Sequence, residues 1–254
     1  MSIIPQRLKT DLHLELGSAA AFLAIGFGLV LRLRQYTLNL SFWLDEAMLA
    51  LNIVNRSFGG LIRPLDYDQG APLGFLWIIK ALESLLGNHE FSLRLFPFLA
   101  SCLGLILLWQ LARQLIQPLG VVFALLVFAS SRYLVSYGAQ VKQYTVDVTI
   151  ALLLQLLALK LLGKKCTNRD YAILAVLGAL SVWMSHAAVF VLGGAGLVLI
   201  GAAARKKDWS AALKFGLASS VWGLNFVALY FIQYRSLASN AYLTSYYRIY
   251  LICI

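Results

Sequence analysis

Residues 18–31, SAAAFLAIGFGLVL, form an apolar run without a charged side chain. Lys9 precedes the run, and Arg32 and Arg34 follow it directly. A cleavable signal sequence would end in small residues before its cleavage site, whereas this run leads into two arginines. We therefore predict an uncleaved first membrane span at residues 17–35, which enters the membrane from the cytoplasmic side.

The rest of the chain has the same apolar character. Of its 254 residues, 61% are hydrophobic and 13% are charged, and the mean hydropathy is +0.78. Soluble domains carry about 25% charged residues. One water-soluble core could not hide this much apolar surface, so the predicted fold class is all-α, a polytopic bundle of transmembrane helices. The three cysteines show no CxxC or Cys/His spacing, which indicates neither a zinc site nor a disulfide framework.

Crossing a bilayer takes about 20 apolar residues, which predicts about seven spans in this chain. They are residues 17–35, 94–113, 118–136, 146–163, 171–186, 187–204 and 211–232. Alternation from the first span puts the basic clusters at 160–169 and 205–207 on the cytoplasmic side, as the positive-inside rule expects of short loops. The net charge of +10 is scattered between spans and forms no basic face interleaved with aromatics, so we expect no nucleic-acid partner.

The segment 36–93 is predicted to be a long outer loop. Two stretches in it, 45–57 and 72–87, have helical apolar periodicity and are predicted to lie as amphipathic helices in the membrane interface. Reading the second as a short span would invert every later loop. Six of the eleven acids fall in this segment: Asp45, Glu46, Asp66, Asp68, Glu83 and Glu90. Carboxylates and basic residues gathered on one face indicate a site at the membrane surface for a charged head group.

The stretch LRLRQYTLNLSFWLDEAMLA (31–50) resembles the first-loop signature of the GT-C glycosyltransferases. These polytopic enzymes use polyprenyl-phosphate-linked sugars, and they include the protein mannosyltransferases and the aminoarabinose transferases of lipid A. The resemblance continues in order through QGAPLGFLWIIKALESLLGNHEFSLRLFPFLAS (69–101), YGAQVKQYTVD (137–147) and WMSHAAVF (183–190). The matching positions are Arg32, Tyr36, Trp43, Asp45, Glu46, Pro72, Leu73, Gly87, Glu90, Arg94, Lys142, Tyr144 and Asp147.

The resemblance implies an integral multi-pass membrane protein, here expected in a bacterial plasma membrane with its N-terminus in the cytoplasm. It implies a polyprenyl-phosphate-linked sugar and membrane lipid as partners, with an unspecified acceptor. Family members usually continue beyond this length, so we expect residues 1–254 to be a GT-C-like transmembrane domain that is truncated at its C-terminus. An inactive fragment and a lipid-linked-sugar flippase or transporter are the alternative functions.

In such a transfer the acceptor loses a proton while negative charge develops on the leaving phosphate. The resemblance gives Asp45 the role of general base, with Glu46 beside it as a second catalytic or supporting carboxylate. The structural alternative for Asp45 is that it caps a helix beginning at Glu46. Glu90 and Arg94 have the spacing of an ion pair within one helix.

Three side chains are candidates for binding the donor phosphate: Lys142, Arg63 and His186. Each has a structural alternative. Lys142 could be a snorkelling lysine at a helix end, Arg63 a solvated arginine, and His186 a structural histidine with satisfied hydrogen bonds. Four more are candidates for a supporting role: Asp147, Tyr144, Asp66 and Asp68. Asp147 could orient Lys142, act as a second site carboxylate or be the buried partner of a neighbouring polar group. Tyr144 could belong to the interfacial aromatic belt. Asp66 and Asp68 could form a turn.

The sequence requires no cofactor. A divalent metal is the open alternative, but Gly70 and Ala71 stand before Pro72, where family members usually carry a charged or imidazole side chain. Only Gln69, Asp68 and Asp66 are near in the sequence. Gln140 stands where a glutamate is expected in the second outer loop.

Overall fold

The computed structural model describes residues 6–235, with side chains from Gly17 onward except at Tyr234. Every regular element in that part of the chain is helical. The α-helices are α1 (Gln6–Thr37), α2 (Leu44–Asn55), α3 (Leu73–Leu86), α4 (Glu90–Leu115), α5 (Pro118–Ser130), α6 (Arg132–Tyr137), α7 (Tyr144–Leu162), α8 (Asn168–Met184), α9 (Ala188–Arg205) and α10 (Trp209–Leu229). A short 3-10 helix, η1 (Gly60–Ile62), follows α2, and a π-helical turn, η2 (Tyr230–Tyr234), extends α10.

Five helical segments are long and apolar enough to cross a membrane: Gly17–Thr37 of α1, α4, α7, α9 and Trp209–Gln233. The predicted all-α membrane bundle is therefore confirmed, while the predicted number of spans is approximate. All seven predicted spans are helical, but α5 has 13 residues and α8 has 17. At about 1.5 Å per residue, both helices are shorter than the apolar thickness of a bilayer, which is about 30 Å, and α5 is the shorter of the two.

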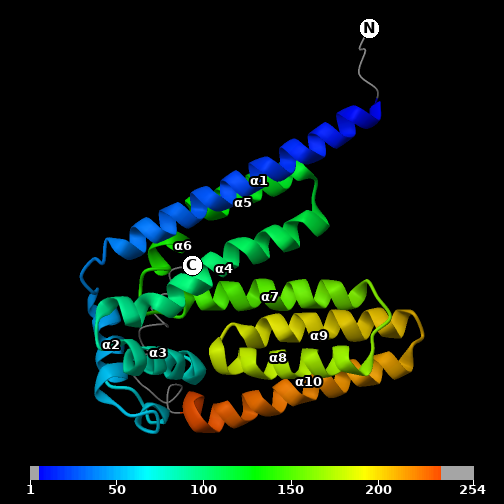
Figure 1. The fold of residues 1–254 in the computed structure, drawn as a ribbon. Coiled ribbons are helices and arrows are strands. Elements are labelled where there is room, and N and C mark those ends of the chain that lie inside the picture. The colour runs from blue at the N-terminus through cyan, green and yellow to red at the C-terminus, as the bar shows by residue number, and fades with distance from the viewer. Residues whose placement is uncertain (1–5, 236–254) are drawn as a thin grey trace, which may run out of the picture.

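The long helices lie side by side in Figure 1, with α1 and α5 on one flank, α4 and α7 in the middle, and α8, α9 and α10 on the other flank. Because each helix reverses direction, the connections gather at two ends. One, here called the loop end, holds residues 38–89, 131–143 and 185–187. The other, here called the lysine end, holds residues 116–117, 163–167 and 206–208. The carboxylates of the first predicted outer loop and the basic clusters at 160–169 and 205–207 thus lie at opposite ends.

The predicted helix 118–136 is divided in the structure into α5 and α6, with Ser131 between them. The cause is a tertiary contact of Arg32, whose side chain is buried against the end of α5. Its guanidinium donates to the carbonyls of Phe128 and Ala129, both at 3.4 Å, which would otherwise accept from the next helical turn. It also donates to Ser101 Oγ at 2.8 Å. Arg32 therefore ties α1, α4 and α5 together.

Small residues allow the closest helix contacts. A Cβ atom at Gly28 would lie 2.9 Å from the Cβ of Ala129, so α1 and α5 are in near-backbone contact there. A Cβ at Gly178 would lie 2.5 Å from the ring of Trp222, which packs α8 against α10. Membrane helices commonly pack through small residues in this way, because apolar side chains gain little by leaving lipid.

The loop end contains the two helices predicted at 45–57 and 72–87, observed as α2 and α3. Lys80 of α3 donates to the carbonyl of Val54 at 3.1 Å and pairs with Glu83 at 3.0 Å, which stabilises the C-terminus of α2. The indole of Trp77 donates to the carbonyl of Phe58 at 2.9 Å. These bonds hold α2, α3 and the segment between them as one unit. The side chain of Lys9 lies outside the described side chains. The expected truncated end, residues 236–254, lies outside the described residues.

Candidate functional site

The ammonium of Lys142 lies 3.0 Å from Oδ2 of Asp45. Asp45 is in the first turn of α2, and Lys142 is in the segment that joins α6 to α7. The two ends of this pair differ in burial, since the side chain of Asp45 is 62% exposed and that of Lys142 is 9% exposed. The pair therefore presents a carboxylate to the surface and keeps its cation behind it.

Asp45 does not cap α2. The helix begins at Leu44, its N-cap residue is Trp43, and no side chain makes a capping hydrogen bond there. The carboxylate instead forms an ion pair with Lys142 through Oδ2, and Oδ1 is not part of this pair. The alternative that Asp45 caps a helix beginning at Glu46 is therefore wrong.

Gln69 is a second partner of Lys142, and we did not single it out as a site residue. Its Oε1 accepts from the ammonium at 3.0 Å. An ammonium has three protons to donate. Lys142 therefore has donors beyond the one that it directs at Gln69. One feature of the sequence could have pointed to Gln69. It lies three residues before Pro72, close to where the resemblance implies a functional side chain.

Glu46 and Arg94 form a buried two-point ion pair. Arg94 Nε lies 2.9 Å from Glu46 Oε1, and Nη2 lies 3.2 Å from Oε2. The backbone N–H of Val141 also donates to Oε1, at 2.9 Å. Glu46 is 1% exposed and Arg94 is 2% exposed. Since Val141 directly precedes Lys142, this cluster fixes the segment that carries the cation against α2 and α4.

These contacts favour the supporting role for Glu46 over direct catalysis. Both of its oxygens are engaged by protein donors, and its side chain is closed to solvent. The predicted pair between Glu90 and Arg94 is present, but at 3.9 Å it is longer than the contacts with Glu46. The remaining donors of Arg94 reach Asn39 Oδ1 at 3.2 Å and the carbonyl of Leu40 at 2.7 Å. Arg94 is thus the centre of a satisfied buried network.

Asp147 and His186 lie where α7 meets the turn between α8 and α9. The side chain of Asp147 hydrogen bonds with that of Ser185, the fully buried C-cap residue of α8. Among the described side chains Lys142 pairs with Asp45 and donates to Gln69, so an orienting role of Asp147 toward Lys142 finds no support there. Burial lowers the pKa of His186 to about 4. Near neutral pH this imidazole is therefore uncharged, and it cannot supply positive charge to a phosphate.

Asp66 and Asp68 lie in a turn between η1 and α3. The carboxylate of Asp66 pairs with Arg56 at 2.8 Å, and its backbone N–H donates to Asn52 Oδ1 at 2.8 Å. Tyr67 and Asp68 have φ values of +61° and +54°, in the left-handed region that turns use. The turn interpretation therefore accounts for Asp66, and Asp68 continues the same turn.

Arg63 and Tyr144 lie at the surface of the loop end. Arg63 is exposed beside a small cavity of about 20 Å³ that Gln69 and Gln233 also line. Tyr144 begins α7, is 40% exposed, and packs against Tyr137 with ring centroids 4.7 Å apart. Among the described side chains, Asp45 and Lys142 pair with each other and Lys142 also donates to Gln69, whereas Arg63 forms an ion pair with neither residue.

A bundle of membrane-length helices with a surface carboxylate and a buried cation at one end defines an integral membrane protein with a site for a charged group. The sequence model of the family described as dolichyl-phosphate-mannose-protein mannosyltransferase matches residues 70–244. The chain belongs to this family and is a multi-pass membrane glycosyltransferase of the GT-C type, which implies a lipid-linked sugar donor. No curated protein and no solved structure matches the chain. The matched range contains Arg94, Lys142 and His186 and begins after Asp45 and Glu46.

Proposed function

We propose that the chain transfers a sugar from a polyprenyl-phosphate donor to an acceptor at the loop end, with Asp45 as the general base and Lys142 as the phosphate-binding cation. The observation that supports this most directly is the 3.0 Å contact between an exposed carboxylate and a nearly buried ammonium. The resemblance at residues 31–50 assigned the base role to the same aspartate.

The reaction has a balanced form at this pair. The acceptor O–H or N–H loses its proton to Oδ1 of Asp45, and the freed electron pair forms the bond to the anomeric carbon of the sugar. The bond between the anomeric carbon and the phosphate oxygen breaks, and its electrons stay on the polyprenyl phosphate. Lys142, whose ammonium lies between Asp45 and Gln69, stabilises the charge that develops there.

Burial of Lys142 makes the cation effective. A charge screened from water interacts more strongly with a developing phosphate charge than a solvated one does. With 9% of its side chain exposed and its ammonium 3.0 Å from the exposed carboxylate of Asp45, Lys142 would bind the phosphate next to the general base. The Glu46–Arg94 cluster holds the lysine segment there without touching the reactants.

We also propose that the loop end faces away from the cytoplasm and that the N-terminus is cytoplasmic, in a bacterial plasma membrane. The lysine end carries the basic clusters in its short loops, as cytoplasmic loops do. We propose a transfer without a bound metal, supported by the uncharged Gly70 and Ala71 before Pro72. Among the side chains that the structure describes, from Gly17 onward, no group of three His, Cys, Asp or Glu residues has a metal-binding arrangement.

The test is a transfer assay with the purified full chain and radiolabelled polyprenyl-phosphate sugars. We expect Asp45→Asn to lower the transfer rate by about a hundredfold to ten-thousandfold, because a general base contributes that much. Asp66→Asn is the matched control, since it removes an exposed acid at the same end that pairs with Arg56, and it should retain activity. Movement of label across vesicles without transfer would favour the flippase, and absence of transfer by the unaltered chain would contradict the proposal.

A further inference from the structure

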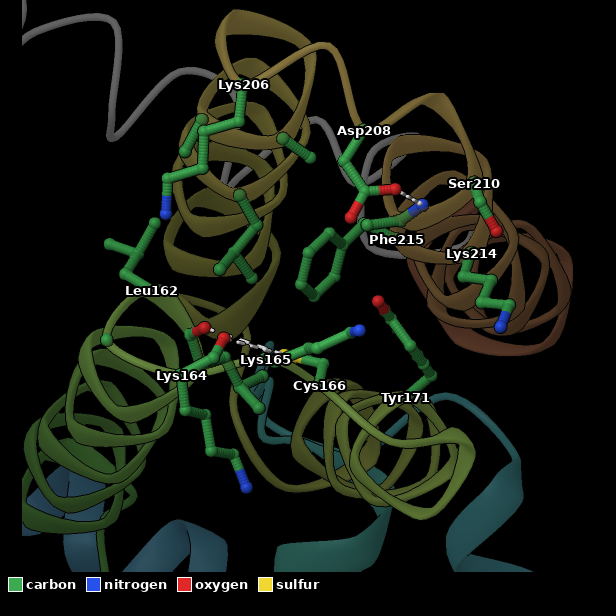
Figure 2. A pocket seen from close by; sticks show the side chains of 16 residues that line it. Leu162, Lys164, Lys165, Cys166, Tyr171, Lys206, Asp208, Ser210, Lys214 and Phe215 are labelled. Carbon is green, nitrogen blue, oxygen red and sulfur yellow. Dashed lines mark hydrogen bonds between the residues drawn. The ribbon is translucent and has the colours of Figure 1, made fainter.

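A cavity of about 670 Å³ lies at the lysine end, far from Asp45 along the bundle. It is bounded by the end of α7 with the loop after it, the start of α8, the end of α9 and the start of α10. Four lysines from these segments line it: Lys164, Lys165, Lys206 and Lys214 (Figure 2). The proposed transferase site does not use any of them.

The lining of this cavity carries excess positive charge. Lys164 is neutralised by Asp170 at 2.6 Å and points away from the centre in Figure 2. Lys165 and Lys206 form no ion pair with a carboxylate among the described side chains, which begin at Gly17, and Lys214 bonds to the neutral Oδ1 of Asn168 at 3.0 Å.

The cavity also contains few groups that would repel an anion. Among its described lining residues Asp208 is the acid, and one of its oxygens accepts from the N–H of Ala211 at 3.0 Å as the N-cap of α10. Tyr171 and Ser210 add hydroxyl groups to the lining, and Figure 2 shows the Tyr171 hydroxyl directed into the space. The cavity thus offers ammonium and hydroxyl donors to an anion.

An apolar groove adjoins the cavity. It has a volume of about 400 Å³ and runs between α4, α7 and α9, with Gln155 as the polar residue in an otherwise apolar lining. Leu162 lines both the cavity and the groove. On α9 the groove ends at Val198 and the cavity begins at Leu199, so the two follow one another along the same helix. Together they form an amphipathic site, basic at the end of the bundle and apolar toward its middle.

We propose that this site binds an anionic membrane phospholipid, with its phosphate headgroup among Lys165, Lys206 and Lys214 and an acyl chain in the groove. Basic pockets between membrane helices suit anionic headgroups, and each lysine near the surface adds attraction for them. A free phosphate ion would use the lysines but not the groove. The groove is therefore what favours a lipid over a soluble anion.

The test is a thermal-shift titration of the purified full chain in detergent with phosphatidylglycerol. Phosphatidylcholine and inorganic phosphate are titrated in parallel. We expect phosphatidylglycerol to stabilise the protein, and Lys165→Gln/Lys206→Gln to weaken its apparent affinity by about tenfold or more. The matched control, Lys160→Gln/Arg169→Gln, removes two exposed positive charges from the same end that do not line the cavity, and it should bind as the unaltered chain does.

The groove is tested separately with Gly194→Leu. A Cβ at Gly194 meets no atom within 4 Å, so the leucine fills groove space without a clash at its Cβ. We expect weaker binding of phosphatidylglycerol, whereas Gly193→Leu, on the same helix with an equally open Cβ, does not line the groove and should leave binding unchanged.

Three outcomes would overturn the proposal: equal affinity in the double-lysine variant, equal losses in variant and control, or stabilisation by inorganic phosphate as strong as that by phosphatidylglycerol. If the double-lysine variant does not fold, the single variant Lys165→Gln decides the question by the same comparison. Because the readout is binding, the result does not depend on sugar transfer.

Discussion

Glu46 and Arg94 face each other across 48 positions of sequence and form the most deeply buried ion pair of the described residues, with side chains 1% and 3% exposed. The pair joins the first turn of α2 to the first turns of α4, and Val141 adds the segment before α7. Since the neighbours of these residues are Asp45 and Lys142, the pair sets the geometry of the proposed site without taking part in the transfer.

Removal of one partner from this pair leaves the other charge buried. We expect Arg94→Met to lower the free energy of unfolding by about 3–5 kcal/mol, the range typical of a broken buried pair. Unfolding of the purified protein in detergent measures the change. Glu90→Gln is the control, because Glu90 is partly exposed and 3.9 Å from Arg94, and its effect should stay within about 0.5 kcal/mol. Equal effects of the two substitutions would show that the buried pair does not stabilise the fold.

Gln69 should matter through Lys142. We expect Gln69→Leu to lower the transfer rate by about tenfold or more, because the loss of a hydrogen bond from a charged ammonium is worth about 1.5–3 kcal/mol and the ammonium is less well positioned. Gln114→Leu is the control, since this glutamine is exposed on α4 and bonds only the carbonyl of Gln110 among the described residues. An unchanged rate in Gln69→Leu would remove Gln69 from the site.

His186 makes stability depend on pH. Burial depresses the pKa of His186 from its ordinary value of 6.5 to about 4 in the folded protein, so between these values the unfolded chain binds the proton more readily. Its contribution to stability is complete above pH 6.5 and is lost as the pH falls toward 4. We expect His186→Gln to flatten the decline of unfolding temperature over this window. A pH profile of unfolding that is identical in the variant would contradict the buried, neutral imidazole.

The sequence predicted the helices well, because apolar runs of membrane length admit few other structures. It did not predict the break at Ser131, which depends on Arg32 reaching the carbonyls of Phe128 and Ala129 from another helix. Such a contact has no local signature. The sequence therefore predicts one continuous span over residues 118–136.

The candidate site was predicted in part. The proximity of Asp45 and Lys142 followed from the resemblance, not from spacing, since 97 positions separate them. Local rules favoured the i, i+4 pair of Glu90 and Arg94, whereas the shorter contact of Arg94 is with the distant Glu46. Gln69 was overlooked as a site residue because an uncharged amide gives no electrostatic signal. His186 was considered as a phosphate contact because sequence does not reveal the burial that keeps it neutral.

The most direct measurement of the central claim is a double-mutant cycle on the transfer rate with Asp45→Asn, Lys142→Gln and the two combined. Residues that act as one catalytic unit are strongly non-additive. We predict that Asp45→Asn alone abolishes most of the transfer and that the double variant is at most a few times slower than this single variant. Near-normal transfer by Asp45→Asn, or a double variant whose loss equals the product of the two single losses, would contradict the account.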